Sequence, residues 1–130
     1  MSAAADQDPA QVEGPLAVVE EHVRAFNACD LAAVMAGFDE EAVFSTADQL
    51  AVGVRAISQL FAASFAAPAT AHLELVRAVV DDDTVGCEMT ELIQAEGIQH
   101  ALDVAAFYTV RGGRIARVRI YRDLVGQPRS

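Results

Sequence analysis

The sequence contains no lysine and no tryptophan, and all nine of its basic residues are arginine. Set against 19 acidic residues, they leave a net charge of −10. Binding to nucleic acid needs clustered cations that meet the phosphates, so nucleic acid is not an expected partner. Five arginines do cluster near the end of the chain, where they fit an edge or partner-facing strand better than an anion site: Arg111, Arg114, Arg117, Arg119 and Arg122.

Cysteine is scarce as well, and signals for secretion or membrane insertion are missing. Cys29 and Cys87 form neither a C-x-x-C motif nor a Cys/His ligand spacing, so we expect two unpaired thiols, buried or half-buried, in a reduced cytoplasmic protein. The first residues lack the positive and apolar regions of a secretory signal. No apolar run approaches the ~18 residues of a membrane span, so no membrane contact is expected.

Motifs for cofactors and metals are also absent from the sequence. His22, His72 and His100 have no partner at metal-ligand spacing. The sequence shows no P-loop, no dinucleotide fingerprint and no Ser-His-Asp elbow. We therefore expect neither a metal nor a cofactor.

What the chain does contain is enough apolar sequence for one packed domain. It has 130 residues, of which 53% are hydrophobic and 22% are charged, the balance of a globular domain of ordinary size. Residues 1–13 are small, acidic and polar, and we predict that they form a disordered leader. Residues 14–127 are predicted to form the single domain.

Apolar spacing predicts helices in the first half of the domain. A helix is expected from Pro15 to about Cys29, and Asp30 should cap a short second one. Two short strands, 42–46 and 49–52, should precede a third helix that begins near Val54 and ends before Pro68.

The second half reads as a meander of four β-strands. These are expected at 73–80, 85–94, 98–110 and 114–124, with Gly-containing turns between the later ones. Helices followed by antiparallel strands indicate an α+β domain with its helices on one face of the sheet.

Three segments carry a resemblance to a known family: "CDLAAVMAGFDEEAVF", "GVRAISQLF" and the closing "FYTVRGGRIARVRIYRD". Over about residues 15–125 the chain resembles the SnoaL-like polyketide cyclase branch of the nuclear transport factor 2-like superfamily. The resemblance implies a cystatin-like α+β roll, a cone of three N-terminal helices packed on a curved, mostly antiparallel sheet around one pocket. It also implies a small acid/base enzyme, of cyclase, isomerase or dehydratase type, that acts on an apolar polyketide-like or polycyclic molecule.

The same resemblance gives Asp123 the role of general acid/base, with Tyr121 beside it. Burial in an apolar cavity would raise the pKa of such a carboxylate toward neutrality. Strand alternation puts Arg119 and Tyr121 on the face of Asp123, while Val118 and Ile120 face outward and would be covered by a second subunit, giving a homodimer. A bulge would shift this phase, and a structural anchor paired with arginine is the alternative for Asp123.

Two relatives suggest further pocket residues. Limonene epoxide hydrolases use an Asp-Arg-Asp arrangement. In the corresponding positions this sequence has Met89 for the arginine and Glu91 for the first aspartate. Without the arginine, epoxide hydrolysis is not expected. Ketosteroid isomerase has a carboxylate base just after its first strand. The matching segment here, Phe44-Ser45-Thr46, has no such base, and Asp48 in the following loop would have to replace it. We expect Glu91, Met89, Phe44 and Asp48 at the pocket, although Glu91 could instead be a solvated outer charge.

The long strand and the first helix complete the predicted pocket. Asp103, Phe107 and Thr109 share one parity on strand 98–110, so they line the pocket if that face points inward, and otherwise Asp103 is a surface charge. Phe26 is expected in the pocket wall.

The sequence leaves two alternatives to an enzyme open. A non-catalytic protein that binds a small apolar ligand would explain why the histidine, arginine and first-strand base of catalytic relatives are missing. A structural dimerisation domain would have a filled core, with a cavity under ~100 Å³, whereas ligand pockets usually measure ~300–1,000 Å³.

Overall fold

A computed structural model describes residues 9–123 and 127–128 of the chain, with side chains from 14 to 123. None of the described helices is long and apolar enough to cross a membrane. The helices are α2 (Pro9–Asn27), α3 (Leu31–Ala36) and α4 (Val54–Ala66). The strands are β1 (Phe38–Ser45), β2 (Leu50–Val52), β3 (Thr70–Asp81), β4 (Thr84–Ala95), β5 (Ile98–Arg111), β6 (Arg114–Arg122) and β7 (Gln127–Pro128).

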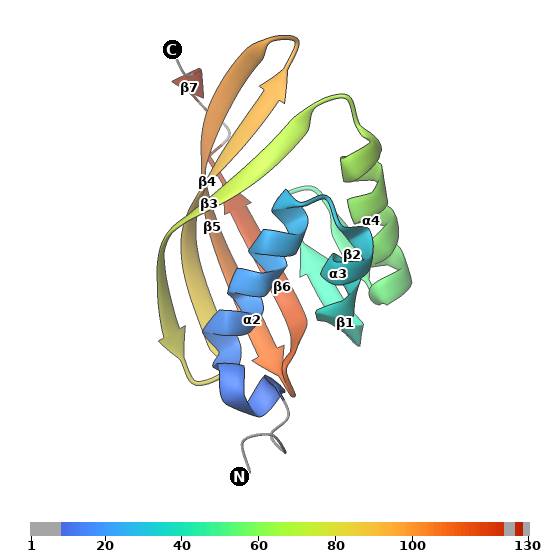
Figure 1. Ribbon diagram of the computed structural model, residues 1–130, viewed down its shortest axis with the longest axis vertical. Coiled ribbons are helices and arrows are strands. Elements are labelled where there is room, and N and C mark those ends of the chain that lie inside the picture. Colours follow the sequence, from blue (N-terminus) through green and yellow to red (C-terminus); the bar gives the residue numbers. More distant parts are fainter. Residues whose placement is uncertain (1–8, 124–126, 129–130) are drawn as a thin grey trace.

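One mixed sheet forms the body of the domain. Its strand order is β2-β1-β6-β5-β4-β3, and β7 pairs with β5 beside this path. Only β1 and β6 run parallel, and the other pairs are antiparallel. In Figure 1 the long strands curve around one side of α2, while α3 and α4 lie over the β1–β2 end. The predicted α+β class is confirmed, and α4 follows the β1–β2 pair rather than preceding the whole sheet.

Helix α2 has a break near its start that the sequence anticipates. Gly14 has non-helical angles (φ 71°, ψ 175°), and Pro15 begins the main part of the helix, where its missing N–H costs nothing. Residues 9–13, which fall within the predicted leader, are helical. Residues 1–8 lie outside the described part of the chain, as does Leu124, the predicted last residue of the final strand.

The end of α2 explains why Cys29 is exposed. Its φ is 54°, and the Asp30 and Cys29 N–H groups donate to the carbonyls of Ala25 and Phe26 at 3.1 and 2.9 Å. This is the Schellman pattern, in which the left-handed residue projects away from the core. Both cysteines are free, as predicted, but the expected burial of Cys29 was wrong. Cys87 is buried, and burial raises the pKa of its thiol to about 11.

The core lies between the helices and the concave face of the sheet. Val19 and Phe26 of α2 and Ile57 and Phe61 of α4 meet inward-facing strand residues such as Val85. Each full burial of an aliphatic or aromatic side chain contributes roughly 1.5–3 kcal/mol. The Asn27 side chain also joins α2 to β3, because it donates to the Leu73 carbonyl at 2.9 Å and accepts from the Leu73 N–H at 2.8 Å.

The face of β6 that points inward is the opposite of the one predicted. Thr109 pairs with Arg117 and Val110 pairs with Ile115, so Ala116 is an extra residue in a bulge. Beyond the bulge, Val118 is fully buried and Ile120 faces the same interior, whereas Arg119, Tyr121 and Asp123 are exposed. The alternation was predicted correctly, but the apolar residues turn toward the core because burial of their surface stabilises the fold.

Candidate functional site

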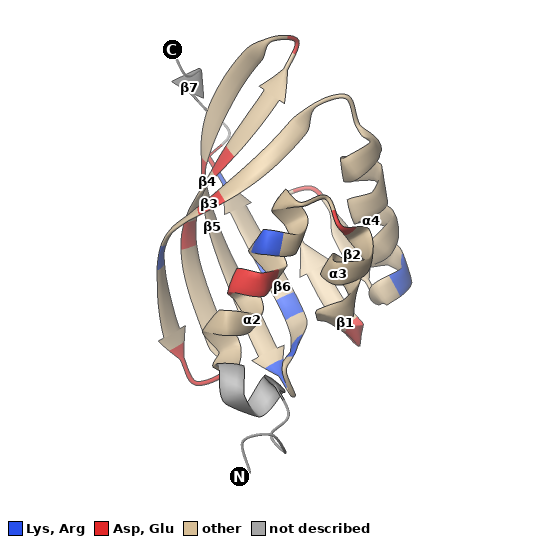
Figure 2. Ribbon diagram, viewed as in Figure 1, with Lys and Arg blue, Asp and Glu red and all other residues tan. Residues whose placement is uncertain are grey.

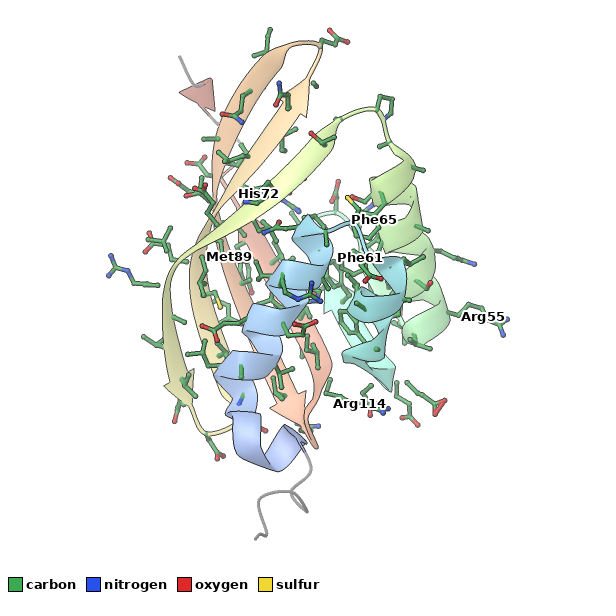
Figure 3. All side chains as sticks on the ribbon, viewed as in Figure 1. Arg55, Phe61, Phe65, His72, Met89 and Arg114 are labelled. Atoms are coloured by element: carbon green, nitrogen blue, oxygen red, sulfur yellow. The ribbon has the colours of Figure 1, made fainter. Side chains whose placement is uncertain are left out.

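A cavity of about 350 Å³ lies between α2, α4 and the concave face of the sheet. Its volume falls within the range of small-molecule sites and well above that of a filled structural core. The apolar walls come from Phe26, Phe44, Leu60, Phe61, Ala63, Leu73, Met89, Val104 and Ile120. The polar lining comes from His22, Thr46, Gln49, Ser64, Glu91, Tyr108 and Arg122. In Figure 3, Phe61 and Met89 lie on opposite sides of α2.

One end of the cavity holds a carboxylate paired with a guanidinium. Glu91 shares the inward parity of Met89 on β4 and is only 6% exposed. Arg122, at the end of β6, donates from Nε to Glu91 Oε1 at 2.8 Å. Glu91 Oε2 makes no hydrogen bond to any described residue. Arg122 is therefore the charged partner of Glu91, and Glu91 Oε2 is not engaged by any described residue.

Another polar group that lines the cavity is a histidine set among aromatic rings. His22 is 6% exposed and meets the rings of Phe38, Phe61 and Tyr108 edge-on, with centroids 5.5–5.9 Å away. Its Nδ1 has no hydrogen-bond partner among the described residues. Burial lowers the pKa of His22 to about 4, so the imidazole is neutral at pH 7. Burial also raises the pKa of Tyr108, which keeps its hydroxyl protonated.

Four of the predicted pocket residues line this cavity: Glu91, Met89, Phe26 and Phe44. Asp48 does not, because it is exposed in the β1–β2 loop, where it accepts a hydrogen bond from the lining residue Thr46 at 3.2 Å. On β5 the inward residues are Val104, Ala106 and Tyr108. Asp103, Phe107 and Thr109 therefore face outward, which corrects their predicted place in the pocket.

The predicted catalytic pair and Arg119 also lie outside the cavity. Tyr121 is 50% exposed, its ring packs edge-on against Phe107 at 6.1 Å, and Arg119 lies 6.0 Å above it. Asp123 is exposed, and its N–H donates to the Asp103 carbonyl at 2.9 Å. Because β6 turns Val118 and Ile120 inward, these three side chains are carried to the other face. Figure 2 shows the basic residues spaced along β6.

Among the cavity residues that were not predicted, three have a signal in the sequence: His22, Tyr108 and Arg122. His22 lies three residues after Val19 and four before Phe26, on the apolar stripe of the first helix. Tyr108 has the parity of Val104 and Ala106. Arg122 has the parity of Val118 and Ile120, so an apolar face taken as the core side would have placed it inside.

The Glu91–Arg122 pair should contribute to stability in a way that an exposed pair does not. Replacing Arg122 by Met leaves a buried carboxylate without its partner, and we expect the free energy of unfolding to fall by about 2 kcal/mol. This is below the roughly 3–5 kcal/mol of a fully buried pair, because the Arg122 side chain is 35% exposed. Urea denaturation of both proteins at pH 7 measures the difference.

Arg77 supplies a matched control for this measurement. Its Nε lies 2.8 Å from Glu88 Oε1, the same separation as in the cavity pair, but the two side chains are 74% and 54% exposed. Arg77→Met should therefore change the free energy of unfolding by less than about 1 kcal/mol. Equal losses for the two arginine variants would contradict a special role of burial at Glu91.

The site contains no arrangement typical of a metal centre. Across the described residues, no group of three His, Cys, Asp or Glu side chains could hold a metal ion. The cavity offers instead a carboxylate with one oxygen that no described residue engages, a guanidinium with further donors, a neutral imidazole and a tyrosine hydroxyl. Such a set can accept a proton and donate hydrogen bonds to an oxygen of a bound molecule.

Comparison with known proteins gives a family and a shared fold. The model of the SnoaL-like domain family matches residues 19–118. Among the curated proteins, none matches the sequence. An LEH-like epoxide hydrolase from M. tuberculosis superposes with a TM-score of 0.75 at 21% identity, covering 82% of this chain and 80% of that one.

Two candidate polyketide cyclases are also similar in structure. The one from Sinorhizobium meliloti is 26% identical with a TM-score of 0.68, and covers 79% of this chain and 92% of its own. The one from Pseudomonas putida is 23% identical with a TM-score of 0.74, and covers 85% and 92%. The family match spans most of the domain, including α4 and most of the cavity-lining residues. The chain belongs to the SnoaL-like domain family.

Proposed function

We propose that the protein is a small-molecule acid/base enzyme of cyclase, isomerase or dehydratase type, acting on an apolar polyketide-like or polycyclic substrate in the cavity. The observation that carries the proposal is Glu91, a buried carboxylate with one oxygen held by Arg122 and the other unengaged among the described residues. The names of the polyketide cyclase neighbours agree with this class of reaction.

The proposed step is a proton transfer at carbon. Glu91 Oε2 takes the proton from a carbon next to a substrate carbonyl, so that the C–H bond breaks and an O–H bond forms. The electron pair moves onto the carbonyl oxygen as an enolate. Arg122 uses only Nε toward Glu91 in the free protein, and its terminal N–H groups are the donors that would stabilise the enolate. Ring closure, isomerisation or loss of water then follows according to the substrate.

A ligand-binding protein without catalysis is the second candidate. The resemblance to limonene epoxide hydrolases puts Met89 at the position of their arginine, and no carboxylate of β1 is among the cavity-lining residues. Both departures leave the cavity with fewer reactive groups than a catalytic relative would have. The cavity itself serves either function equally well.

Substitutions at the mouth of the cavity can test both the enzyme and the ligand-binding protein. Ala63 and Ala62 are neighbours on α4 and both are exposed, but only Ala63 lines the cavity. Ala63→Trp should fill the mouth and abolish binding of small molecules, whereas Ala62→Trp should bind as the wild type does. The measurement is mass spectrometry of apolar metabolites retained by each protein from an organic extract.

The outcomes assign the function. Compounds retained by the wild type and by Ala62→Trp, and chemically changed on incubation, support an enzyme. Compounds retained but returned unchanged support the binding protein. If Ala63→Trp retains the same compounds as the wild type, the cavity is not the site and both proposals are wrong.

We also propose that the protein is a homodimer formed through the outer face of the sheet, in the cytoplasm. Val118 and Ile120, on which the expected dimer rested, are turned inward, but the outer face carries other exposed apolar side chains. Phe107, Tyr121 and Val79 are 45%, 50% and 68% exposed. Phe107 lies over Gly86, which pairs with Val79, and its ring packs against that of Tyr121, so strands β3 to β6 contribute to one apolar area. A second copy would remove this area from water.

A charge placed in this area should prevent the association. Phe107→Glu is expected to sediment as a monomer at micromolar concentration, where the wild type sediments as a dimer, because two buried carboxylates would face each other across a two-fold axis. Val52→Glu is the control, since Val52 is also an exposed apolar residue but lies on β2 at the far edge of the sheet. A monomeric wild type would disprove the proposal.

A further inference from the structure

Strand β3 forms one edge of the sheet. The strand order places it last, on the side away from β2, and in Figure 1 its arrowhead lies at the outer left of the sheet. The backbone of an edge strand presents N–H and C=O groups to the side, where a strand of another chain can pair with them. Whether β3 is open to such pairing depends on which of these groups are already bonded.

Asn27 identifies the residues of β3 whose backbone groups point away from the sheet. Its side chain donates to the Leu73 carbonyl and accepts from the Leu73 N–H, so Leu73 directs both groups away from β4. In an antiparallel pair, bonded and unbonded residues alternate. Counted along β4 from the partner of Leu73, every second residue is unbonded to β3, and these residues include the partners of Ala78 and Val80. Ala78 and Val80 therefore also direct their N–H and C=O groups away from β4.

The turn after β3 gives the same result. Asp81 and Thr84 close a two-residue turn, and the residues that close such a turn bond each other, so Val80 is again unbonded to β4. No described residue bonds the backbone of Ala78 or Val80 from the side of the edge. Val79 and Val80 are also 68% and 49% exposed. Residues 77–81, which we call the open edge, thus combine unpaired backbone groups with exposed apolar side chains.

The same segment of a second copy fits this open edge in one register. With the two strands antiparallel about Val79, Ala78 of each copy meets Val80 of the other, and each of these two pairs exchanges two hydrogen bonds. On the outer face, Val79 then meets Val79 of the second copy, and Arg77 meets Asp81. The registers centred on Ala78 or on Val80 instead place a charged residue opposite Val79. Hydrogen bonding, apolar contact and charge therefore favour the same register.

We propose that the open edge of β3 pairs antiparallel with the open edge of a second copy of this chain. The pairing has two-fold symmetry, so it joins copies in twos. It differs from the outer-face association proposed above, which depends on the side chains of Phe107 and Tyr121 rather than on backbone groups at the side of the sheet. Because the overlap covers only residues 77–81, far less than a standard interface, the association is weak and needs submillimolar protein.

Sedimentation of Phe107→Glu tests the edge by itself, because this variant should lack the outer-face association. We expect a monomer at micromolar concentration and a dimer at submillimolar concentration. Adding Val80→Pro should abolish this dimer, since proline removes an N–H group that serves the second copy and no hydrogen bond to β4 is lost. If the outer-face proposal is wrong, the wild type will show the same monomer–dimer behaviour as Phe107→Glu, so the two failures are distinguishable.

Two charge variants, made in the Phe107→Glu protein, test the register. Arg77→Asp and Asp81→Arg each place like charges opposite each other at two symmetric positions, and each should raise the dissociation constant about tenfold. An equimolar mixture of the two should associate as the parent does, because one chain supplies both carboxylates and the other both guanidiniums. Asp48→Arg makes the same charge change at an exposed position in the β1–β2 loop and should have no effect.

Three results would overturn the proposal. One is an absence of concentration-dependent association in both the wild type and Phe107→Glu. Another is a dimer that persists when Val80→Pro is added, with a melting temperature that shows the variant to be folded. The third is a mixture of the two charge variants that associates no better than either alone.

Discussion

Replacing Glu91 by Gln is expected to lower the turnover of the substrate at least a hundredfold while leaving its binding within a few-fold of the wild type. General acid/base groups contribute about 10²–10⁴ in rate, and a glutamine keeps the shape of the side chain but cannot accept the proton. Its amide oxygen can still accept from Arg122 Nε, which lies 2.8 Å from Glu91 Oε1, so the cavity should keep its form. Turnover and dissociation constants for a retained metabolite measure both effects.

Two further carboxylates serve as controls for this result. Glu88 lies on the same strand but is exposed on the outer face and paired with Arg77, so Glu88→Gln should turn over the substrate normally. Asp123, the catalytic residue suggested by the resemblance, is exposed and does not line the cavity. Asp123→Asn should also be fully active. A large loss in Asp123→Asn with normal turnover in Glu91→Gln would reverse our assignment of the base.

Acid should destabilise the protein through His22. The pKa of His22 is about 4 in the folded protein, and its ordinary value is 6.5. Between these two pH values His22 is protonated in the unfolded chain and neutral in the folded protein. The contribution of His22 to stability is complete above pH 6.5 and is lost as the pH falls toward 4. With about 1.4 kcal/mol for each pKa unit, the loss between pH 7 and pH 4 amounts to about 3 kcal/mol.

The difference between two proteins isolates this loss from the titration of the many carboxylates. Urea denaturation across pH 4–7 should show the wild type losing about 3 kcal/mol more than His22→Phe, because phenylalanine takes up no proton in either state. His72→Phe, changed at an exposed position, should lose stability as the wild type does. Parallel pH profiles for the wild type and His22→Phe would show that His22 is not buried as a neutral group.

Local sequence was sufficient to predict most of the secondary structure. Pro15 begins the main part of α2, and Asp30 caps α3 by accepting from the Ala33 N–H at 3.1 Å. The Arg111-Gly112-Gly113 turn joins β5 and β6 as expected, with both glycines at positive φ. These features depend on residues close together in the chain, so the sequence expresses them directly.

The candidate site was predicted only in part, because its residues depend on which face of each strand is buried. Glu91, Met89, Phe26 and Phe44 were placed at the cavity. The resemblance, however, assigned Asp123 to the interior, and the rest of β6 was then oriented to suit it. A one-residue change of phase exchanges the two faces of a strand. That single assumption therefore placed Arg119, Tyr121 and Asp123 in the pocket and left Arg122 out of it.

The sequence by itself determined the α+β class, the order of the elements and the alternation within β6. Each of these follows from spacing along the chain, which a single sequence records. Only the tertiary structure decided that Val118 and Ile120 face the core, that Arg122 meets Glu91 across the sheet, and that His22 lies buried among three rings. Those contacts join residues up to 86 positions apart. Burial of apolar surface against the helices favours all of them, and on β6 the bulge at Ala116 also sets which residues face inward.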